Sequence, residues 1–356
     1  MMQKKHIIVG PMRPHNPRLP TDESSKRETI VICNKCHSLV LGPEIHTAVV
    51  ENGKFVHKLC SESILNAKTD WQKHKIPKIA HFYWSESTIP FLRYLTLYSF
   101  NKVNPEWQIK FYFPKYRTAT KSWTSQEHKT NGANYCDYYG DLQKLPIEFI
   151  EFDFSDIGIR NDLSEVHKSD LLRWHLLSAQ GGLWSDTDIV YFRGMDRLLF
   201  ESTYIDDIDT LINLWPEGRG KITANLHSIG FILGSSNNTY YNYIAKKSKE
   251  KHNFNSYQAV GAELLGDLFP TLESIVNKFK ELRMGNIPMD VVYPYNSFNI
   301  HKIYNRNEPL RFTARTLGLH WYGGHRLAAK SVTELTKENF RQYNNVLSKT
   351  IELALE

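Results

Sequence analysis

The chain has 356 residues, of which 41% are hydrophobic and 13% aromatic, and this composition excludes disorder as its overall state. No stretch approaches the roughly 18 consecutive apolar residues of a transmembrane helix, and the N-terminus lacks the apolar run of a secretory signal. Four cysteines are too few for a disulfide scaffold in a chain of this length. We therefore expect a protein of the cytoplasm, or of the host cytoplasm if the source is viral, without membrane insertion.

The net charge of +6 is concentrated near the N-terminus. The first 75 residues hold twelve Lys and Arg against seven Asp and Glu, so the rest of the chain is near neutral at +1. A basic segment of this kind is typical of a solubilising tail or of a nucleic-acid-binding patch. Residues 1–28 contain four prolines and a polar run, which predicts a flexible basic tail.

Residues 29–65 are predicted to form a small zinc-binding module with a hairpin at 49–56 around Asn-Gly. Four side chains have the spacing of a tetrahedral Cys₃His zinc site: Cys33, Cys36, His57 and Cys60. The pattern is similar to treble-clef and LIM-type modules, in which structural Zn²⁺ replaces a hydrophobic core. His37 and His46 are alternative ligands, Cys136 is too distant to be related, and the alternative without metal is three reduced, buried cysteines.

From residue 76 onward, short apolar runs alternate with helical periodicity, which predicts an α/β fold with a parallel sheet. The predicted strands are 78–84, 108–113, 147–154, 183–192, 229–233 and 291–293. The predicted helices are 91–101, 167–180, 240–250, 257–268 and 334–353, the last of them polar. We therefore expect one domain over 76–330, followed by a C-terminal helix over 331–356.

The segment most informative about chemistry joins the helix at 167–180 to the strand after it. Asp170 and Arg173 are three residues apart and share a helix face, and Gly181-Gly182 is a helix-stop signal. The next strand brings Asp186 and Asp188 to the edge of the sheet at which α/β proteins bind ligands. Two carboxylates, together with the oxygens of a diphosphate, suit Mn²⁺ or Mg²⁺.

An isolated Asp-x-Asp is a weak signal, because chance alone supplies about one copy in a chain of this length. Asp207-Ile208-Asp209 is such a copy, and it lacks the helix, the glycine pair and the preceding apolar strand. The complete arrangement over 169–188 is far more specific than the motif alone.

The stretch 169–188 resembles the sugar-binding region of retaining glycosyltransferases with the GT-A fold, a Rossmann-like nucleotide-sugar-binding domain. The most similar family includes yeast mannosyltransferases and bacterial capsular enzymes, with the glucosylating clostridial toxins as more distant relatives. Residues 76–84 are similar to the first strand of that family, and 319–322 to its closing His-Trp element. The resemblance extends over about 76–326 and implies the GT-A fold.

The resemblance also implies roles in binding the donor. Trp84 would stack on the nucleotide base, while Asp170 and Arg173 would hold the donor sugar, and Asn225 would lie near the acceptor side. The family often has Gly-Pro where this chain has 257–263, which lacks proline, so no acceptor role is assigned there. The alternatives are a core tryptophan at Trp84 and a simple intrahelical ion pair for Asp170 and Arg173, worth about 0.3–0.5 kcal/mol.

For the metal, the resemblance implies that Asp188 binds Mn²⁺ or Mg²⁺ directly and that Asp186 contacts the ribose and a metal-bound water. His320 would be a further contact to the metal or the diphosphate. The alternative for His320 is a hydrogen-bonded histidine of the core.

The function expected from these observations is metal-dependent, retaining transfer of a hexose-type sugar. The donor would be a nucleoside diphosphate sugar, with UDP favoured over GDP, and the acceptor a hydroxyl of a macromolecule. Hydroxymethylated DNA is one candidate acceptor, because a basic zinc module suits phosphate contacts, and proteins or polysaccharides are the others. The alternative is an inactive, zinc-containing nucleic-acid-binding protein, against which four costly polar side chains at 169–188 argue.

Overall fold

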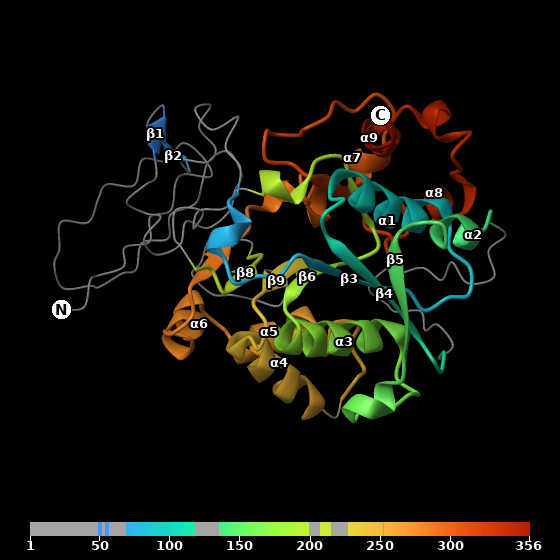
Figure 1. Cartoon of the computed structure of the whole chain (residues 1–356). Coiled ribbons are helices and arrows are strands. Elements are labelled where there is room, and N and C mark those ends of the chain that lie inside the picture. Colours follow the sequence, from blue (N-terminus) through green and yellow to red (C-terminus); the bar gives the residue numbers. More distant parts are fainter. Residues whose placement is uncertain are drawn as a thin grey trace.

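In the computed structural model, the described residues are 49–51, 54–56, 69–118, 135–198, 207–214, 227–251 and 253–356. A central sheet lies between two layers of helices (Figure 1). The helices on one face include α1 (Phe91–Val103), α7 (Ile300–Tyr304), α8 (Ala329–Glu334) and α9 (Val346–Leu355). Those on the other face include α3 (Glu165–Ala179), α4 (Thr239–Lys249) and α5 (Ala262–Leu268). The fold is therefore α/β, as predicted.

The central sheet has seven strands in the order β10-β8-β9-β6-β3-β4-β5. Their bounds are β3 (Ile79–Tyr83), β4 (Gln108–Pro114), β5 (Ile147–Phe152), β6 (Gly182–Ser185), β8 (Thr210–Ile212), β9 (Phe231–Gly234) and β10 (Met284–Asn286). Four neighbouring pairs are parallel: β3–β4, β3–β6, β4–β5 and β8–β10. Strand β9 is antiparallel to both of its neighbours, so the sheet is mostly rather than wholly parallel.

Helix α3 ends where the sequence predicts, at the double glycine. Gly181 and Gly182 have φ of 69° and 89°, in the left-handed region that side chains disfavour. A Cβ at Gly181 would lie 2.5 Å from the carbonyl carbon of Ser235, and one at Gly182 would lie 2.4 Å from the carbonyl oxygen of Ile79. The glycines therefore let the chain turn directly from α3 into β6 against the neighbouring strands.

The predicted strand 183–192 is in fact two strands in different sheets. After β6 the chain turns at 186–188, and β7 (Ile189–Tyr191) pairs with β11 (Gly318–His320) in a separate antiparallel sheet. The backbone carbonyl of Asp188 accepts from the N–H of Trp321, so the turn is held by the segment after β11. The prediction missed this break because apolar residues lie on both sides of it.

Two other predictions near the C-terminus are wrong. Residues 291–293 do not form a strand: a 3-10 turn, η9 (Met289–Val291), lies there. The single polar helix over 334–353 is replaced by α8, a 3-10 turn η11 (Phe340–Tyr343) and α9. Helix α9 is capped by Asn345, whose side chain accepts from the N–H of Ser348, and it buries one apolar face in the core.

The shorter elements complete the comparison with the sequence. Helices α2 (Tyr139–Leu142) and α6 (Leu272–Lys278) were not predicted, and the helix expected over 257–268 begins only at Ala262. The two strands of the hairpin expected at 49–56 are present, with β1 (Val49–Glu51) antiparallel to β2 (Lys54–Val56), and the Asn-Gly positions between them lie outside the described residues. The tail 1–28, Asn225 and the predicted zinc ligands Cys33, Cys36, His57 and Cys60 lie outside the described residues.

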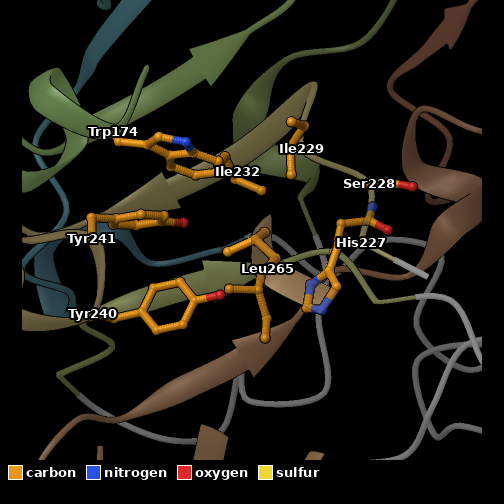
Figure 2. A pocket seen from close by; sticks show the side chains of 10 residues that line it. Trp174, His227, Ser228, Ile229, Ile232, Tyr240, Tyr241 and Leu265 are labelled. Carbon is orange, nitrogen blue, oxygen red and sulfur yellow. The ribbon is translucent and has the colours of Figure 1, made fainter. Parts of the chain in front are cut away.

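Hydrophobic side chains fill both faces of the central sheet. On the face covered by α3, α4 and α5, a small hollow lies beside the aromatic rings of Trp174, Tyr240 and Tyr241 (Figure 2). It offers about 10 Å³ to the centres of water molecules, enough for about one ordered water. The amide nitrogen and oxygen of buried Asn213 and Nε2 of buried His227 have no hydrogen-bond partner among the described residues, and they suit such a water. In the part of the chain that the structure describes, no helix is long and apolar enough to cross a membrane.

His81 is fully buried in β3, where both of its ring nitrogens have partners. Nε2 lies 2.8 Å from the carbonyl oxygen of Gly181, and Nδ1 lies 3.2 Å from the hydroxyl of Tyr112. The neutral ring satisfies both contacts, because Nε2–H donates to the carbonyl and Nδ1 accepts from the phenol. Burial, with a smaller effect of the charge of Lys110, lowers the pKa of His81 from 6.5 to about 4, in spite of the contact with Gly181, which raises it.

We predict that this histidine makes the fold less stable at acidic pH. Below about pH 6.5 the unfolded chain protonates His81, whereas the folded chain does so only near pH 4, so the free energy of unfolding falls through this window. The expected loss between pH 7 and pH 5 is about 2 kcal/mol, measured by urea unfolding. His81→Gln removes this titration, so its loss should be smaller by that amount. An equal pH dependence in both proteins would contradict the prediction.

Candidate active site

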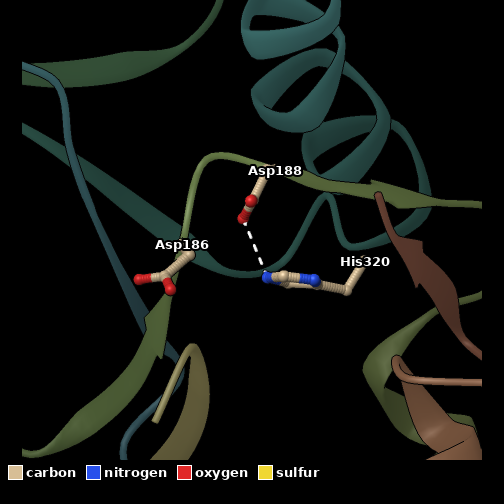
Figure 3. A group of neighbouring side chains, drawn as sticks. All are labelled: Asp186, Asp188 and His320. Atoms are coloured by element: carbon tan, nitrogen blue, oxygen red, sulfur yellow. Dashed lines mark ion pairs between the residues drawn. The ribbon is translucent and has the colours of Figure 1, made fainter. Parts of the chain in front are cut away.

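Three potential metal ligands meet at the turn between β6 and β7. One ligand atom each from Asp186, Asp188 and His320 lies within 4.8 Å of the others (Figure 3). The two aspartates are close in sequence, but His320 is far along the chain. It reaches the site because β11 pairs with β7 and places His320 opposite Ile189. The second sheet therefore completes the cluster that the Asp-x-Asp motif begins.

The two carboxylate oxygens of buried Asp188 have different surroundings. Oδ2 accepts from the N–H of Gly323 at 2.8 Å and lies 3.9 Å from a guanidinium nitrogen of Arg93. Oδ1 lies 3.1 Å from Nε2 of His320 but has no hydrogen-bond partner among the described residues. Burial raises the pKa of Asp188, but His320, Arg93 and the Gly323 N–H together outweigh it and hold the pKa below its ordinary value.

Oδ1 of Asp188, which faces His320 but accepts no hydrogen bond from the described residues, is the oxygen that suits a cation. A buried carboxylate oxygen without a donor is costly, and a metal ion would satisfy it. Two carboxylates and an imidazole are a donor set for Mn²⁺, and the carboxylates also suit Mg²⁺. His320 is no ordinary core histidine with both nitrogens satisfied, because its Nδ1 is buried without a hydrogen-bond partner in the described chain. The residues present therefore fit a divalent metal.

Asp186 is held by three neighbouring groups and is about one third exposed. Its backbone N–H donates to the carbonyl of Gly230 at 2.8 Å. Its Oδ1 accepts from Arg173 at 2.9 Å and from the indole N–H of Trp184 at 2.8 Å. A Cβ on Gly230 would lie 2.5 Å from Oδ2, so the absence of a side chain there leaves room for this oxygen. With Oδ1 occupied by donors, Oδ2 remains for a metal or a water.

Asp170 and Arg173 form a buried ion pair rather than a solvated one. The carboxylate and the guanidinium are 3.2 Å apart, and their side chains are 4% and 3% exposed. Burial raises the pKa of Asp170 to about 7; the charge of Asp186 adds to this rise and that of Arg173 opposes it. Oδ2 of Asp170 and two nitrogens of Arg173 have no hydrogen-bond partner among the described residues. These buried polar atoms therefore have hydrogen-bonding capacity that no described residue satisfies.

The loop before α5 passes directly over this ion pair. A Cβ on Gly261 would lie 2.5 Å from Oδ2 of Asp170 and 2.7 Å from Oε1 of Gln258. The stretch 257–263, which lacks the proline of the family pattern, thus lies against the carboxylate of α3. Because Arg173 contacts both Asp170 and Asp186, the structure brings the ion pair together with the cluster of Asp186, Asp188 and His320.

Trp84 follows β3 and is half-buried. Its indole N–H donates to the carbonyl of Thr88 at 2.9 Å, and the guanidinium of Arg93 lies over its ring at 5.0 Å. The ring also packs against the hydrophobic core. Because Arg93 occupies one face of the indole, a stacked base would have to use the other.

Sequence reasoning missed three residues that shape the site. Arg93 and Gly323 contact Asp188, and Gly230 contacts Asp186, yet none lies near these aspartates in sequence. By contrast, the second Asp-x-Asp, at 207–209, is not part of the cluster of Asp186, Asp188 and His320. Asp209 instead forms an ion pair with Lys75 at 3.1 Å.

Comparisons with known proteins give only distant likenesses. No family model and no curated protein was found to match the chain. Among solved structures it is similar to the PaToxG glycosyltransferase, with 14% identity and a TM-score of 0.39 over 78% of this chain and 87% of that one. It is similar to the glycosyltransferase GlyE of Streptococcus pneumoniae TIGR4, with 12% identity and a TM-score of 0.39 over 79% of this chain and 61% of that one.

A third similar structure is the galactosyltransferase LgtC, solved in complex with donor and acceptor sugar analogs. Its identity is 14% and its TM-score 0.30, over 74% of this chain and 99% of that one.

We predict that Gly230→Ala weakens metal binding. The added Cβ would displace Oδ2 of Asp186, and disturbing the surroundings of a ligand typically lowers metal affinity about 10- to 100-fold. Mn²⁺ titration followed by calorimetry measures the effect. Gly140→Ala in α2 is the matched control. A Cβ at Gly140 meets nothing within 4 Å, so the affinity of this variant for Mn²⁺ should equal that of the wild type. A Gly230→Ala protein that binds Mn²⁺ as tightly as the wild type would rule out Asp186 as a ligand.

Proposed function

We propose that this chain is a metal-dependent glycosyltransferase that uses a nucleoside diphosphate sugar as donor. The observation that carries the proposal is that Asp186, Asp188 and His320 lie together beside the ion pair of Asp170 and Arg173. Some polar atoms of this pair have no hydrogen-bond partner among the described residues. Ligands for a cation and donors and acceptors for hydroxyls are thereby presented together, at the end of a central strand of an α/β sheet. A metal-bound diphosphate joined to a sugar is a ligand that uses both.

In this proposal, one group of residues binds the metal and diphosphate of the donor, and another binds its sugar. Asp188, His320 and Asp186 would hold Mn²⁺ or Mg²⁺, which supplies positive charge for the departing diphosphate. Asp170 and Arg173 would bind the sugar hydroxyls. Because its pKa lies near 7, Asp170 can both accept and donate hydrogen bonds at neutral pH. In this proposal Trp84 offers its free face to the base, and UDP is the favoured nucleotide.

We predict that Asp188→Asn abolishes activity while leaving the fold intact. Asparagine keeps the shape and the contact with Gly323 but loses the charge that attracts the cation, so transfer and donor hydrolysis should fall by at least about 100-fold. Release of UDP from UDP-sugars with Mn²⁺ measures this, and EDTA should have the same effect on the wild type.

The matched control for this variant is Asp207→Asn in the second Asp-x-Asp. Asp207 is exposed and has φ of 61°, a conformation that asparagine tolerates, so its activity should be unchanged. Full activity in Asp188→Asn or in EDTA would overturn the assignment. A wild-type protein that hydrolyses none of a panel of nucleotide sugars would favour the inactive nucleic-acid-binding alternative.

The reaction is proposed to retain the anomeric configuration, on the resemblance of 169–188 to retaining enzymes. In such an internal return, the C1–O bond to the diphosphate breaks and an oxygen of the leaving diphosphate takes the acceptor proton as the new C1–O bond forms. No protein base is then required. We expect an α-linked product from an α-linked donor, determined by NMR of the product, and a β-linkage would refute retention.

The acceptor in this proposal is a hydroxyl of a macromolecule in the cytoplasm. The basic residues of the first 75 positions support an acidic acceptor such as hydroxymethylated DNA, and a protein or a polysaccharide would use the same chemistry at the donor site. The predicted zinc site of Cys33, Cys36, His57 and Cys60 would stabilise the segment that captures it.

A further inference from the structure

Arg93, in the first turn of α1, lies over two indole rings. Its guanidinium carbon lies 5.0 Å from the ring centroid of Trp84 and 4.9 Å from that of Trp321. Arginine stacks well on aromatic faces, and two faces together fix the plane of the guanidinium. The side chain keeps 14% of its surface exposed, so it is largely but not wholly removed from solvent.

The charge of Arg93 is incompletely compensated. Its Nη1 donates to the hydroxyl of Thr187 at 3.1 Å, but it lies 3.9 Å from Oδ2 of Asp188, too far for a hydrogen bond. Its Nε is buried without a partner among the described residues. Burying a guanidinium is costly unless its N–H donors are satisfied. An anion that accepts hydrogen bonds from Arg93 would therefore be bound favourably here.

The position of Arg93 suggests which anion it meets. Trp84 follows β3, Asp188 follows β6 and Trp321 follows β11, so the guanidinium touches three segments that build the site. A Cβ on Gly323 would lie 2.4 Å from Nη2, so the glycine lets the backbone pass close to the cation. Arg93 thus lies between the ring proposed to bind the base and the carboxylate proposed to bind the metal, where a nucleoside diphosphate carries its phosphates.

We propose that Arg93 binds the diphosphate of the donor, as a second positive charge beside the metal. This inference rests on the proposed function. The planar fork of a guanidinium suits phosphate oxygens, and a fixed cation stabilises the charge that develops on the leaving group. The residue comes from α1, outside the segment 169–188 from which the donor site was predicted.

A purely structural role would have different consequences. A cation near the metal site opposes binding of Mn²⁺ alone and favours binding of Mn²⁺ together with a diphosphate. Loss of the charge in Arg93→Gln should therefore weaken binding of UDP while leaving the affinity for Mn²⁺ alone undiminished. Uridine has the base but no phosphates, so its binding should not change.

The experiment measures the affinity for UDP with Mn²⁺ by calorimetry and that for uridine by ligand-observed NMR. For Arg93→Gln we expect about 10- to 100-fold weaker binding of UDP, the loss typical of a charged hydrogen bond, with uridine unchanged. Arg93→Lys keeps the charge without the planar fork, and we expect a smaller loss of about 3- to 10-fold. This variant decides the matter if Arg93→Gln does not fold.

Arg341→Gln is the matched control. Arg341 also lies over an aromatic ring, Phe340 at 4.7 Å, and beside a carboxylate, Glu352 at 3.2 Å, but it is exposed and takes no part in the site. Unchanged binding of UDP in both Arg93 variants, or equal losses for UDP and uridine, would overturn the inference. A wild-type protein that fails to bind UDP with Mn²⁺ would instead overturn the proposed function.

Discussion

The candidate site depends on the guanidinium of Arg173, which links a helix to the end of a strand. It lies 3.2 Å from Asp170 in α3 and 2.9 Å from Asp186 after β6. Burial raises the pKa of Asp170 to about 7; the charge of Arg173 opposes this rise, and the charge of Asp186 adds to it. Loss of Arg173 would leave both carboxylates unpaired, and breaking a buried ion pair in this way typically costs about 3–5 kcal/mol.

Geometry at the double glycine makes this pairing possible. The left-handed conformations of Gly181 and Gly182 turn the chain back so that Asp186 returns to the helix face that carries Arg173. All of these residues lie within a stretch of about twenty, and their contacts follow from helix periodicity and a short turn. This half of the site could therefore be predicted from the sequence, because it is local.

The other half of the site could not be derived in this way, because its contacts are long-range. His320 was proposed from a family resemblance alone, and it meets Asp188 only because β7 leaves the central sheet and pairs with β11. Arg93 carries no sequence signal, since an arginine in an apolar helix is equally consistent with a solvated side chain. Long-range contacts also explain the wrong prediction of one polar helix over 334–353. The buried face of α9 depends on the core residues that pack against it, which the local sequence does not reveal.

The charges of the complete site favour a cation and an anion bound together. Asp170, Asp186 and Asp188 oppose Arg93 and Arg173, an excess of one negative charge when every carboxyl is ionised and His320 is neutral. Binding of a divalent cation makes the net charge of the site positive, and binding of a diphosphate then makes it negative again. Each ligand thus improves the electrostatic setting for the other, which is the linkage expected of a site that takes a metal–diphosphate complex rather than either component alone. Protonation of Asp170 removes one negative charge from the site. Because its pKa is about 7, the net charge of the site changes with pH in the neutral range.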